Sequence, residues 1–308
     1  MMAYVLLIFG MLLLIKGADW FVDGSASIAY MFKIPTVVVG LTIVALGTSL
    51  PELSVSLTAS LEGSNELAIS NVLGSNLFNA LVVVGTSVLI RPFLMDREIV
   101  RRDLVINIFV SVLLLICAFS GKLSKITGIG FVICLISYLG MLVHSTRKNQ
   151  KNAEDEEKTI LPLWKSLVYI VIGVSCIIIG GNFVVNNATI LAKAWGWSET
   201  LIGLTIVSIG TSLPELVTSV VAANKGESGL SLGNALGSNI MNILFILGVS
   251  SILGDLTVIN ENIIDMIILC SVSVVLFIMA KKSDQMTRKR GFFMVFIYAI
   301  YAIYILYR

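Results

Sequence analysis

The stretch GLTIVALGTSLPEL, at Gly40–Leu53, recurs as GLTIVSIGTSLPEL at Gly203–Leu216. At the same offset, NVLGSNLFN (Asn71–Asn79) recurs as NALGSNIMN (Asn234–Asn242). Chance similarity between two apolar helices would match leucines and valines, but it would not match glycine, threonine, serine, proline, glutamate and asparagine in register. The chain is therefore built from two similar halves.

The composition is that of a membrane protein. The 308 residues are 57% hydrophobic and 13% charged, with a mean hydropathy of +0.96, whereas soluble domains carry about 25% charged residues. The net charge of +2 does not indicate a nucleic-acid partner. The first twenty residues have no basic region before their apolar run, so we expect a retained first transmembrane helix and not a signal peptide.

Apolar runs long enough to cross about 30 Å of hydrocarbon occur ten times. The expected spans are 2–30, 34–61, 66–90, 104–120, 124–144, 164–193, 198–224, 229–254, 262–280 and 291–307. The polar segment STRKNQKNAEDEEK divides them into five and five. We therefore expect an all-α polytopic membrane protein with a first repeat at 1–144, a linker at 145–163 and a second repeat at 164–308.

The parity of the spans predicts how the halves are related. Five is odd, so the second half enters the membrane with the opposite orientation, as in the inverted repeats of secondary transporters. Lysine and arginine are concentrated in one set of alternate loops, which includes the linker. By the positive-inside rule, the linker is expected in the cytoplasm and both termini outside, in the plasma membrane of the cell.

Each GTSLPE copy places a proline, Pro51 or Pro214, inside an expected span. Proline has no N–H, so the carbonyl four residues earlier, at Gly47 or Gly210, loses its helical partner. In hydrocarbon an unpaired carbonyl is costly unless another group satisfies it. A bound cation is a good candidate for that group.

Side-chain oxygens gather around the same positions. Thr48 and Ser49 lie four and three residues before Glu52, so the three side chains can converge on one side of a helix. Serine and asparagine share a face in the span that follows. The candidate side-chain ligands are Thr48, Ser49, Glu52, Ser75 and Asn79, with their repeats Thr211, Ser212, Glu215, Ser238 and Asn242.

The charges indicate the sign of the ligand. Glu52 and Glu215 lie well inside their expected spans, where an ionised carboxylate costs about 3 kcal/mol or more. No lysine or arginine occurs in 34–90 or 194–224. The balancing charge must come from protons or metal ions, and an all-oxygen ligand set suits Ca²⁺ and Na⁺ better than Zn²⁺ or copper.

Other readings of these residues stay open. Small and polar residues in transmembrane helices often serve packing, and this reading competes for Ser75, Ser238, Asn71 and Asn234 taken singly. Asp19 has a structural reading as the partner of Lys16, three residues earlier. The sole histidine, His144, and four separate cysteines leave no basis for a zinc site or a disulfide framework, and no nucleophile–base pair indicates an enzyme.

The duplicated GTSLPE and GSN-x-x-N motifs, in two five-helix halves, resemble the α-repeats of the cation/Ca²⁺ exchanger superfamily. The similarity covers essentially the whole chain and is greatest to the prokaryotic Na⁺/Ca²⁺ exchangers. It implies a secondary active antiporter that exchanges Ca²⁺ for Na⁺ by alternating access, with the first and sixth spans sliding across the core.

The resemblance also assigns ligands. It implies Ca²⁺ between Glu52 and Glu215, with backbone oxygens from Thr48 and Thr211. It implies that Na⁺ uses the same glutamates together with Ser49, Ser212, Ser75, Ser238 and the carbonyls near Ala45 and Ser208. One archaeal pattern has aspartate where this chain has Asn242, which leaves the number of coupled ions open.

Ca²⁺/H⁺ exchange is the alternative, because two glutamates can also trade two protons for one Ca²⁺. The duplicated hydroxyl oxygens favour Na⁺. A Na⁺-coupled symporter of an organic solute is less favoured, since neither repeat core has a cation to hold a carboxylate. We expect no cofactor beyond the transported ions, no partner other than Ca²⁺, Na⁺ and the lipid bilayer, and a monomer.

Overall fold

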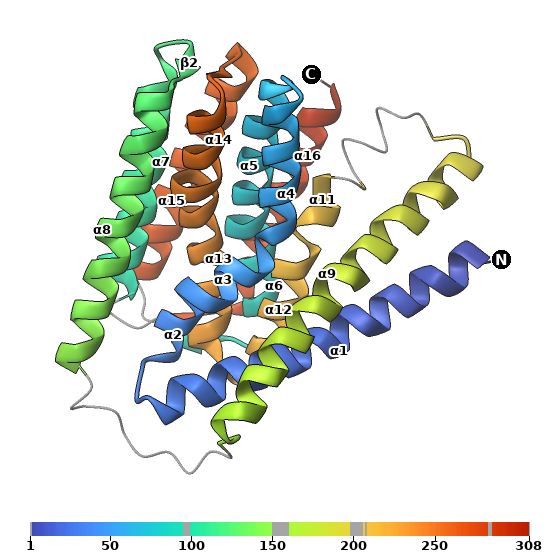
Figure 1. Ribbon diagram of the computed structural model, residues 1–308, viewed down its shortest axis with the longest axis vertical. Coiled ribbons are helices and arrows are strands. Elements are labelled where there is room, and N and C mark those ends of the chain that lie inside the picture. The colour runs from blue at the N-terminus through green and yellow to red at the C-terminus, as the bar shows by residue number, and fades with distance from the viewer. Residues whose placement is uncertain are drawn as a thin grey trace.

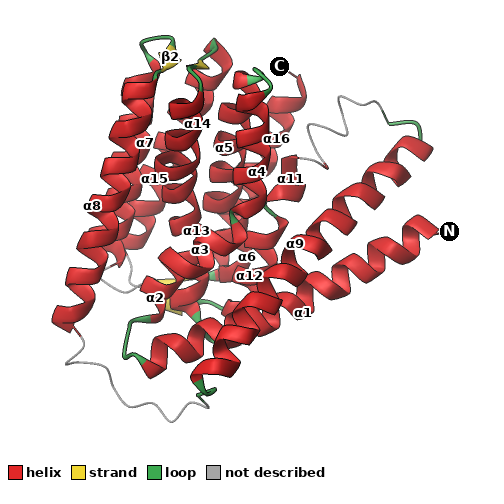
Figure 2. Ribbon diagram, viewed as in Figure 1, coloured by secondary structure: helices red, strands yellow, loops and turns green. Residues whose placement is uncertain are grey.

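The computed structural model describes residues 2–94, 99–149, 160–197, 206, 208–282 and 285–307. Nearly all of this part of the chain is helical, and the strands are short pairs in loops (Figure 2). The elements of the first half are α1 (Met2–Met31), α2 (Thr36–Val39), the π-helical η1 (Gly40–Val44), α3 (Ala45–Thr48), α4 (Leu50–Leu61), α5 (Asn65–Phe78), η2 (Asn79–Val83), α6 (Val84–Ile90), β1 (Phe93–Leu94), η3 (Ile99–Asp103), α7 (Leu104–Ala118), β2 (Lys122–Leu123) and α8 (Lys125–Asn149).

The described part of the second half follows this order at the spacing that relates Gly203 to Gly40, except that the counterpart of η3 lies within α15. Its elements are α9 (Leu163–Ala194), α11 (Ser208–Thr211), α12 (Leu213–Asn224), α13 (Ser228–Met241), η6 (Asn242–Leu247), α14 (Gly248–Leu253), β3 (Leu256–Thr257), α15 (Asn260–Lys282), β4 (Gln285–Met286) and α16 (Arg288–Tyr307). The sequence repeat is thus a repeat of secondary structure, down to the π-helical turns that begin at Asn79 and Asn242.

Contacts between the halves are reciprocal. The loop strand β1 pairs with β4 and β2 pairs with β3, both antiparallel. Since β3 is the counterpart of β1 and β4 that of β2, exchanging the two halves turns one pair into the other. Reciprocal contacts of this kind are what a two-fold relationship produces.

The equivalent helices α1 and α9 lie side by side and cross the upright bundle obliquely (Figure 1). Near the start of α1, Gly10 faces Gly180 and Phe183 of α9, whereas Gly24, later in α1, faces Ser166 near the start of α9. The two helices therefore run antiparallel. A Cβ on Gly17 would lie 2.7 Å from the Cβ of Cys176, so glycine is what permits this close approach.

Seven helices among the described residues are long and apolar enough to cross a membrane. An eighth candidate is the pair Thr36–Thr48 and Leu50–Leu61, which is bent by 50°. The expected span 104–120 corresponds to α7, which has 15 residues and is short for a span. The expected span 198–224 falls partly outside the described residues. Its described part contains the helices α11 and α12.

Two spans form the centre of the molecule. In Asn65–Ile90 and Ser228–Leu253, 72% and 78% of the apolar window is buried, against 17% to 39% in the other five helices. The outward face of α8 instead exposes Ile126, Ile129, Ile133 and Ile136, at the three- and four-residue spacing of one helical face. Such an apolar exposed face suits contact with lipid, whereas the two central spans carry buried polar side chains, among them Ser75 and Ser238.

Candidate cation-binding site

A break in each half places the two glutamates. Ser49 separates α3 from α4 with φ −83° and ψ 8°, and Ser212 separates α11 from α12 with φ −91° and ψ 4°. The sequence reasoning expected each proline to break its helix, and each half has a break, which lies two residues before the proline. The prolines lie in the first turns of α4 and α12, where a missing N–H costs nothing because the helix does not use it.

Glu52 and Glu215 also lie in these first turns, and both are fully buried. The N-terminus of a helix carries a partial positive charge of about half a unit, which stabilises a carboxylate nearby. In the described part of the chain, no lysine or arginine forms an ion pair with either glutamate. The helix ends thus offset the negative charge only in part.

Each glutamate is bonded to a serine of the other half. Ser49 Oγ donates to Glu215 Oε1 over 2.9 Å, and Ser212 Oγ donates to Glu52 Oε1 over 3.1 Å. These two bonds exchange when the halves are exchanged. The motif GTSLPE therefore builds one shared site and not two separate ones.

The central helices add a second serine to each carboxylate. Ser75 Oγ of α5 donates to Glu52 Oε1 at 3.3 Å, and Ser238 Oγ of α13 donates to Glu215 Oε1 at 3.5 Å. The other carboxylate oxygen, Oε2, is buried without a hydrogen-bond partner in both glutamates. Two bare carboxylate oxygens in one buried site are an arrangement that a cation would satisfy.

The asparagines at the start of the π-helical turns differ in their bonds. Asn242 Nδ2 donates to Ser75 Oγ at 3.1 Å, and its Oδ1 has no partner. Both side-chain polar atoms of Asn79 are buried without partners. Since π-helical turns are frequent at functional sites, their position at these two residues agrees with the expected ligands.

The two threonines also differ. Thr48 Oγ1 donates to Asn234 Oδ1 at 2.9 Å, whereas Thr211 Oγ1 is buried without a partner. The carbonyl of Ala45 accepts the N–H of Ser49 at 3.0 Å. Ser208 begins α11, and its side chain lies outside the described part.

Asn71 and Asn234 cross-link neighbouring helices. Asn71 Nδ2 donates to Ser56 Oγ at 3.0 Å, and Asn234 Nδ2 donates to Ser219 Oγ at 2.9 Å. These contacts agree with the packing role that was considered for them. The sequence reasoning passed over Asn76 and Asn239, although both belong to the repeated GSN triplets.

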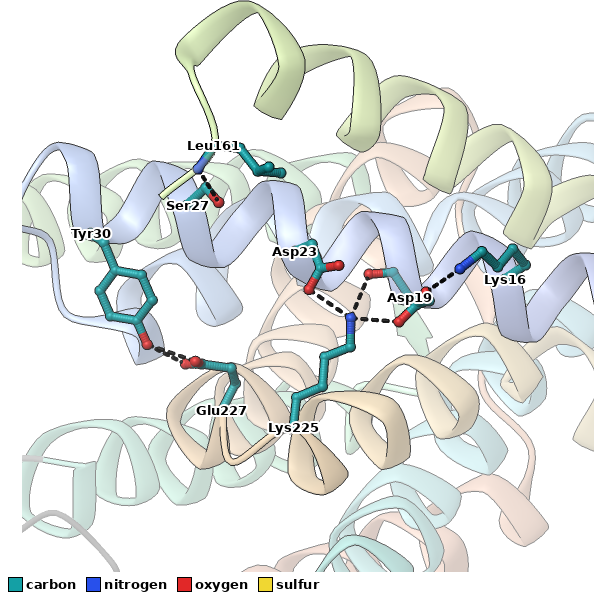
Figure 3. A network of polar contacts seen from close by, with 8 residues as sticks. All are labelled: Lys16, Asp19, Asp23, Ser27, Tyr30, Leu161, Lys225 and Glu227. Carbon is teal, nitrogen blue, oxygen red and sulfur yellow. Dashed lines mark hydrogen bonds and ion pairs between the residues drawn. The ribbon is translucent and has the colours of Figure 1, made fainter. Parts of the chain in front are cut away.

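The acidic residues of α1 lie apart from the glutamates. Figure 3 shows Asp19 between Lys16 and Lys225, and Asp23 at 2.6 Å from the same Lys225 Nζ. Asp19 and Asp23 retain 31% and 43% of their side-chain exposure. The pairing of Asp19 with Lys16 is confirmed, and Lys225 links both carboxylates to the end of α12.

The donor set fits hard cations. Among the residues that the structure describes, no three His, Cys, Asp or Glu side chains come together as a metal site. The groups that surround the glutamates are hydroxyl and amide oxygens, which Ca²⁺ and Na⁺ accept and Zn²⁺ does not prefer.

Comparison with known proteins agrees with this chemistry. The family model described as sodium/calcium exchanger protein matches residues 2–144 and 165–307. The inner membrane protein YrbG of Escherichia coli is 37% identical over 261 residues, which cover 82% of this chain and 80% of YrbG. The sodium/calcium exchanger MaX1 of Methanosarcina acetivorans is 29% identical over an alignment of 345 positions, which covers 99% of this chain and 98% of MaX1.

A solved structure is also similar over nearly its full length. The sodium-calcium exchanger NCX_Mj, soaked with 2.5 mM Na⁺ and 0.1 mM Ca²⁺, superposes with a TM-score of 0.85 at 32% identity and covers 97% of both chains. The repeat, the paired buried glutamates and these matches lead to one assignment. The chain belongs to the sodium/calcium exchanger protein family.

Proposed function

We propose that this protein is a secondary active antiporter that exchanges Ca²⁺ for Na⁺ across the membrane by alternating access. The observation that carries the proposal is the pair of bare Oε2 atoms on Glu52 and Glu215. Both carboxylates are fully buried, and each is joined by a serine to the opposite half. The protein needs no catalytic group or cofactor for this activity.

One Ca²⁺ matches the charge of the site. Two ionised glutamates supply two negative charges, and Ca²⁺ neutralises both. In the proposed site Ca²⁺ lies between Glu52 and Glu215 with backbone oxygens of Thr48 and Thr211. Na⁺ uses the same carboxylates with Ser49, Ser212, Ser75, Ser238, the amides of Asn79 and Asn242, and the carbonyls near Ala45 and Ser208.

The coupling ratio follows from the same charges. Two Na⁺ also neutralise the glutamates, whereas a third adds net positive charge in a medium of low dielectric. Amide and hydroxyl dipoles can still ligate a third Na⁺, and we propose three Na⁺ for each Ca²⁺. Inside-positive voltage, clamped with K⁺ and valinomycin, should then speed Ca²⁺ uptake into Na⁺-loaded proteoliposomes, and uptake that ignores voltage would indicate two Na⁺.

Ten spans in two inverted five-helix repeats, at 1–144 and 164–308, complete the proposal. It is supported by the antiparallel run of α1 and α9 and by the reciprocal strand pairs. The linker at 145–163 is proposed to be cytoplasmic and both termini outside. A cysteine at Lys151, in a background without native cysteines, should resist impermeant thiol reagents on intact cells, and rapid labelling would overturn this orientation.

A Na⁺ gradient distinguishes this function from the alternative. Proteoliposomes loaded with ⁴⁵Ca²⁺ should release it when external Na⁺ is added, and they should hold it when only a pH gradient is applied. Release driven by protons without Na⁺ would replace the proposal with Ca²⁺/H⁺ exchange. The serine bonds to both carboxylates favour Na⁺, because proton exchange does not require these oxygens.

A further inference from the structure

We propose that Asn76 is a positioning residue that holds the amide of Asn242 with its oxygen turned to the cation, and that its counterpart Asn239 does not do this for Asn79. The proposal deepens the proposed function and rests on it. It starts from the two central helices, α5 and α13, where Asn76 and Asn239 are 0% and 1% exposed.

The two asparagines clasp each other's backbone. Asn76 Nδ2 donates to the carbonyl of Asn239 at 3.2 Å, and Asn239 Nδ2 donates to the carbonyl of Asn76 at 3.2 Å. A carbonyl oxygen can only accept a hydrogen bond. Both amides are therefore fixed with nitrogen on the carbonyl, and the oxygen of each amide points elsewhere.

The orientation of Asn76 determines that of Asn242. Asn76 Oδ1 is an acceptor, and the Asn242 side-chain atom 3.0 Å from it must be the nitrogen. A flipped Asn242 amide would put two oxygens against each other. The second proton of the same nitrogen is donated to Ser75 Oγ at 3.1 Å, so Oδ1 is the atom of Asn242 that stays without a partner.

The chain of donors ends on a carboxylate. Ser75 Oγ accepts from Asn242, and its own proton goes to Glu52 Oε1 at 3.3 Å. Both protons of Asn242 Nδ2 and the hydroxyl proton of Ser75 are committed in this chain, which leaves Asn242 Oδ1 and Glu52 Oε2 without partners. An amide oxygen and a carboxylate oxygen can only accept hydrogen bonds, so these bare buried atoms favour a cation and oppose an anion.

The other half lacks this arrangement. Asn239 makes its backbone clasp, but its Oδ1 has no partner, and neither polar atom of Asn79 has one. The orientation of the Asn79 amide is therefore not determined by Asn239. The two GSN asparagines share one packing role, and only Asn76 has the second role.

This difference supplies a matched control. Asn76→Leu and Asn239→Leu each remove the donor of one bond to a backbone carbonyl, keep a similar branched side-chain shape and leave one carbonyl unpaired. We expect both variants to lose thermal stability in Ca²⁺-free detergent solution, and the loss should be larger in Asn76→Leu, which also removes the acceptor of Asn242 Nδ2. The Ca²⁺ concentration that gives half of the Ca²⁺-induced thermal stabilisation should rise about tenfold in Asn76→Leu, equal to about 1.4 kcal/mol, and less than about twofold in Asn239→Leu.

A double variant tests the route of the effect. With Asn242→Ala the ligand oxygen is already absent, so adding Asn76→Leu should not weaken Ca²⁺ binding further, whereas independent effects would add. Equal shifts in the two single variants, or additive shifts in the double variant, would overturn the positioning role. Asn76→Ala and Asn239→Ala repeat the comparison with a smaller perturbation.

The outcomes separate this proposal from the function. Wild-type protein that shows neither Ca²⁺-induced stabilisation nor Na⁺-driven exchange would refute the proposed function itself. If the wild-type protein responds to Ca²⁺ but the Asn76 and Asn239 variants shift the half-stabilising Ca²⁺ concentration equally, only the role of Asn76 is refuted. If all four single variants fail to fold, or if both Asn76 variants fail while the Asn239 variants fold, the role of Asn76 is in folding, and the proposal is also refuted.

Discussion

Ser49 and Ser212 sit at equivalent helix breaks with almost the same backbone angles, and each donates to the glutamate of the other half. Their neighbours Thr48 and Thr211 are equally equivalent in sequence, yet only Thr48 has a partner for its hydroxyl. The local backbone and the serine bonds are thus repeated, while the hydrogen bond of the threonine is not. Each half supplies the surroundings of the other. In this conformation those surroundings differ, so equivalent threonines have different hydrogen bonds.

The same contrast holds on the helices that cross the bundle. Asp19 and Asp23 of α1 bind Lys225, and their counterparts on α9 are Asn182 and Asn186. The counterpart of Lys225 is Glu62. Alternating access requires that the two halves can exchange their arrangements. The ion pairs of Lys225 with Asp19 and Asp23 have no ionic equivalent among Glu62, Asn182 and Asn186, so they stabilise only one of the two conformations.

The largest expected effect tests the symmetric part of the site. Glu52→Gln and Glu215→Gln keep the shape of the side chain and remove its charge, so one Ca²⁺ can no longer be neutralised. Each variant should lose Ca²⁺ exchange in proteoliposomes while it inserts and folds as the wild type does. Exchange at wild-type rate and affinity in either variant would show that the site does not need both carboxylates.

The glycines at the contact between α1 and α9 are expected to give the next largest effect on the protein. Gly17→Val and Gly180→Val should both lower thermal stability by about 1–3 kcal/mol or more, because overpacking a tight interface costs that much. The added Cβ would meet backbone or Cβ atoms at 2.7 Å in both cases. Unequal losses of thermal stability would show that the two sides of this helix contact are not equivalent.

Gly130→Val is the control for this pair. An added Cβ there meets no atom within 4 Å, so the melting temperature should stay close to that of the wild type. Equal destabilisation by all three substitutions would mean that helix propensity and not packing causes the loss.

The threonines provide a smaller and asymmetric effect. Thr48→Val removes the bond to Asn234 Oδ1 and leaves that oxygen unpaired, which should cost about 1 kcal/mol for a bond between membrane helices. Thr211→Val removes a hydroxyl that has no partner, so it should not lower the stability of the ion-free protein. Melting curves in detergent without Ca²⁺ compare the two, and equal losses would contradict the asymmetry.

The smallest effect is expected at Lys225. Its ion pairs are partly exposed, and such pairs contribute about 0.2–1 kcal/mol. Lys225→Gln should lower thermal stability slightly at low salt, and the difference should disappear in about 1 M salt, where the Debye length is about 3 Å. Glu62→Gln, at the equivalent position of the first half, should change stability at neither salt concentration.

Much of the candidate site could be proposed from the sequence because its signals are local. The repeat identified Glu52 and Glu215, the absence of nearby lysine and arginine indicated a cation, and the three-residue spacing predicted the Lys16–Asp19 pair. Charge, hydropathy and short spacing depend only on the order of residues. The same reasoning expected a span at 34–61 that is broken near Pro51, and a break at Ser49 bends it by 50°.

Which oxygens meet across the two halves was decided by tertiary structure alone. Ser49 reaches Glu215 and Asn242 reaches Asn76 over more than 160 positions of sequence, and no local pattern encodes such a distance. Two identical motifs carry no information on which threonine or asparagine finds a partner. The sequence determined that the chain is a membrane protein with duplicated carboxylates. The packing of the two halves determined which donors and acceptors meet around those carboxylates, because only packing brings groups that are distant in sequence to within about 3 Å.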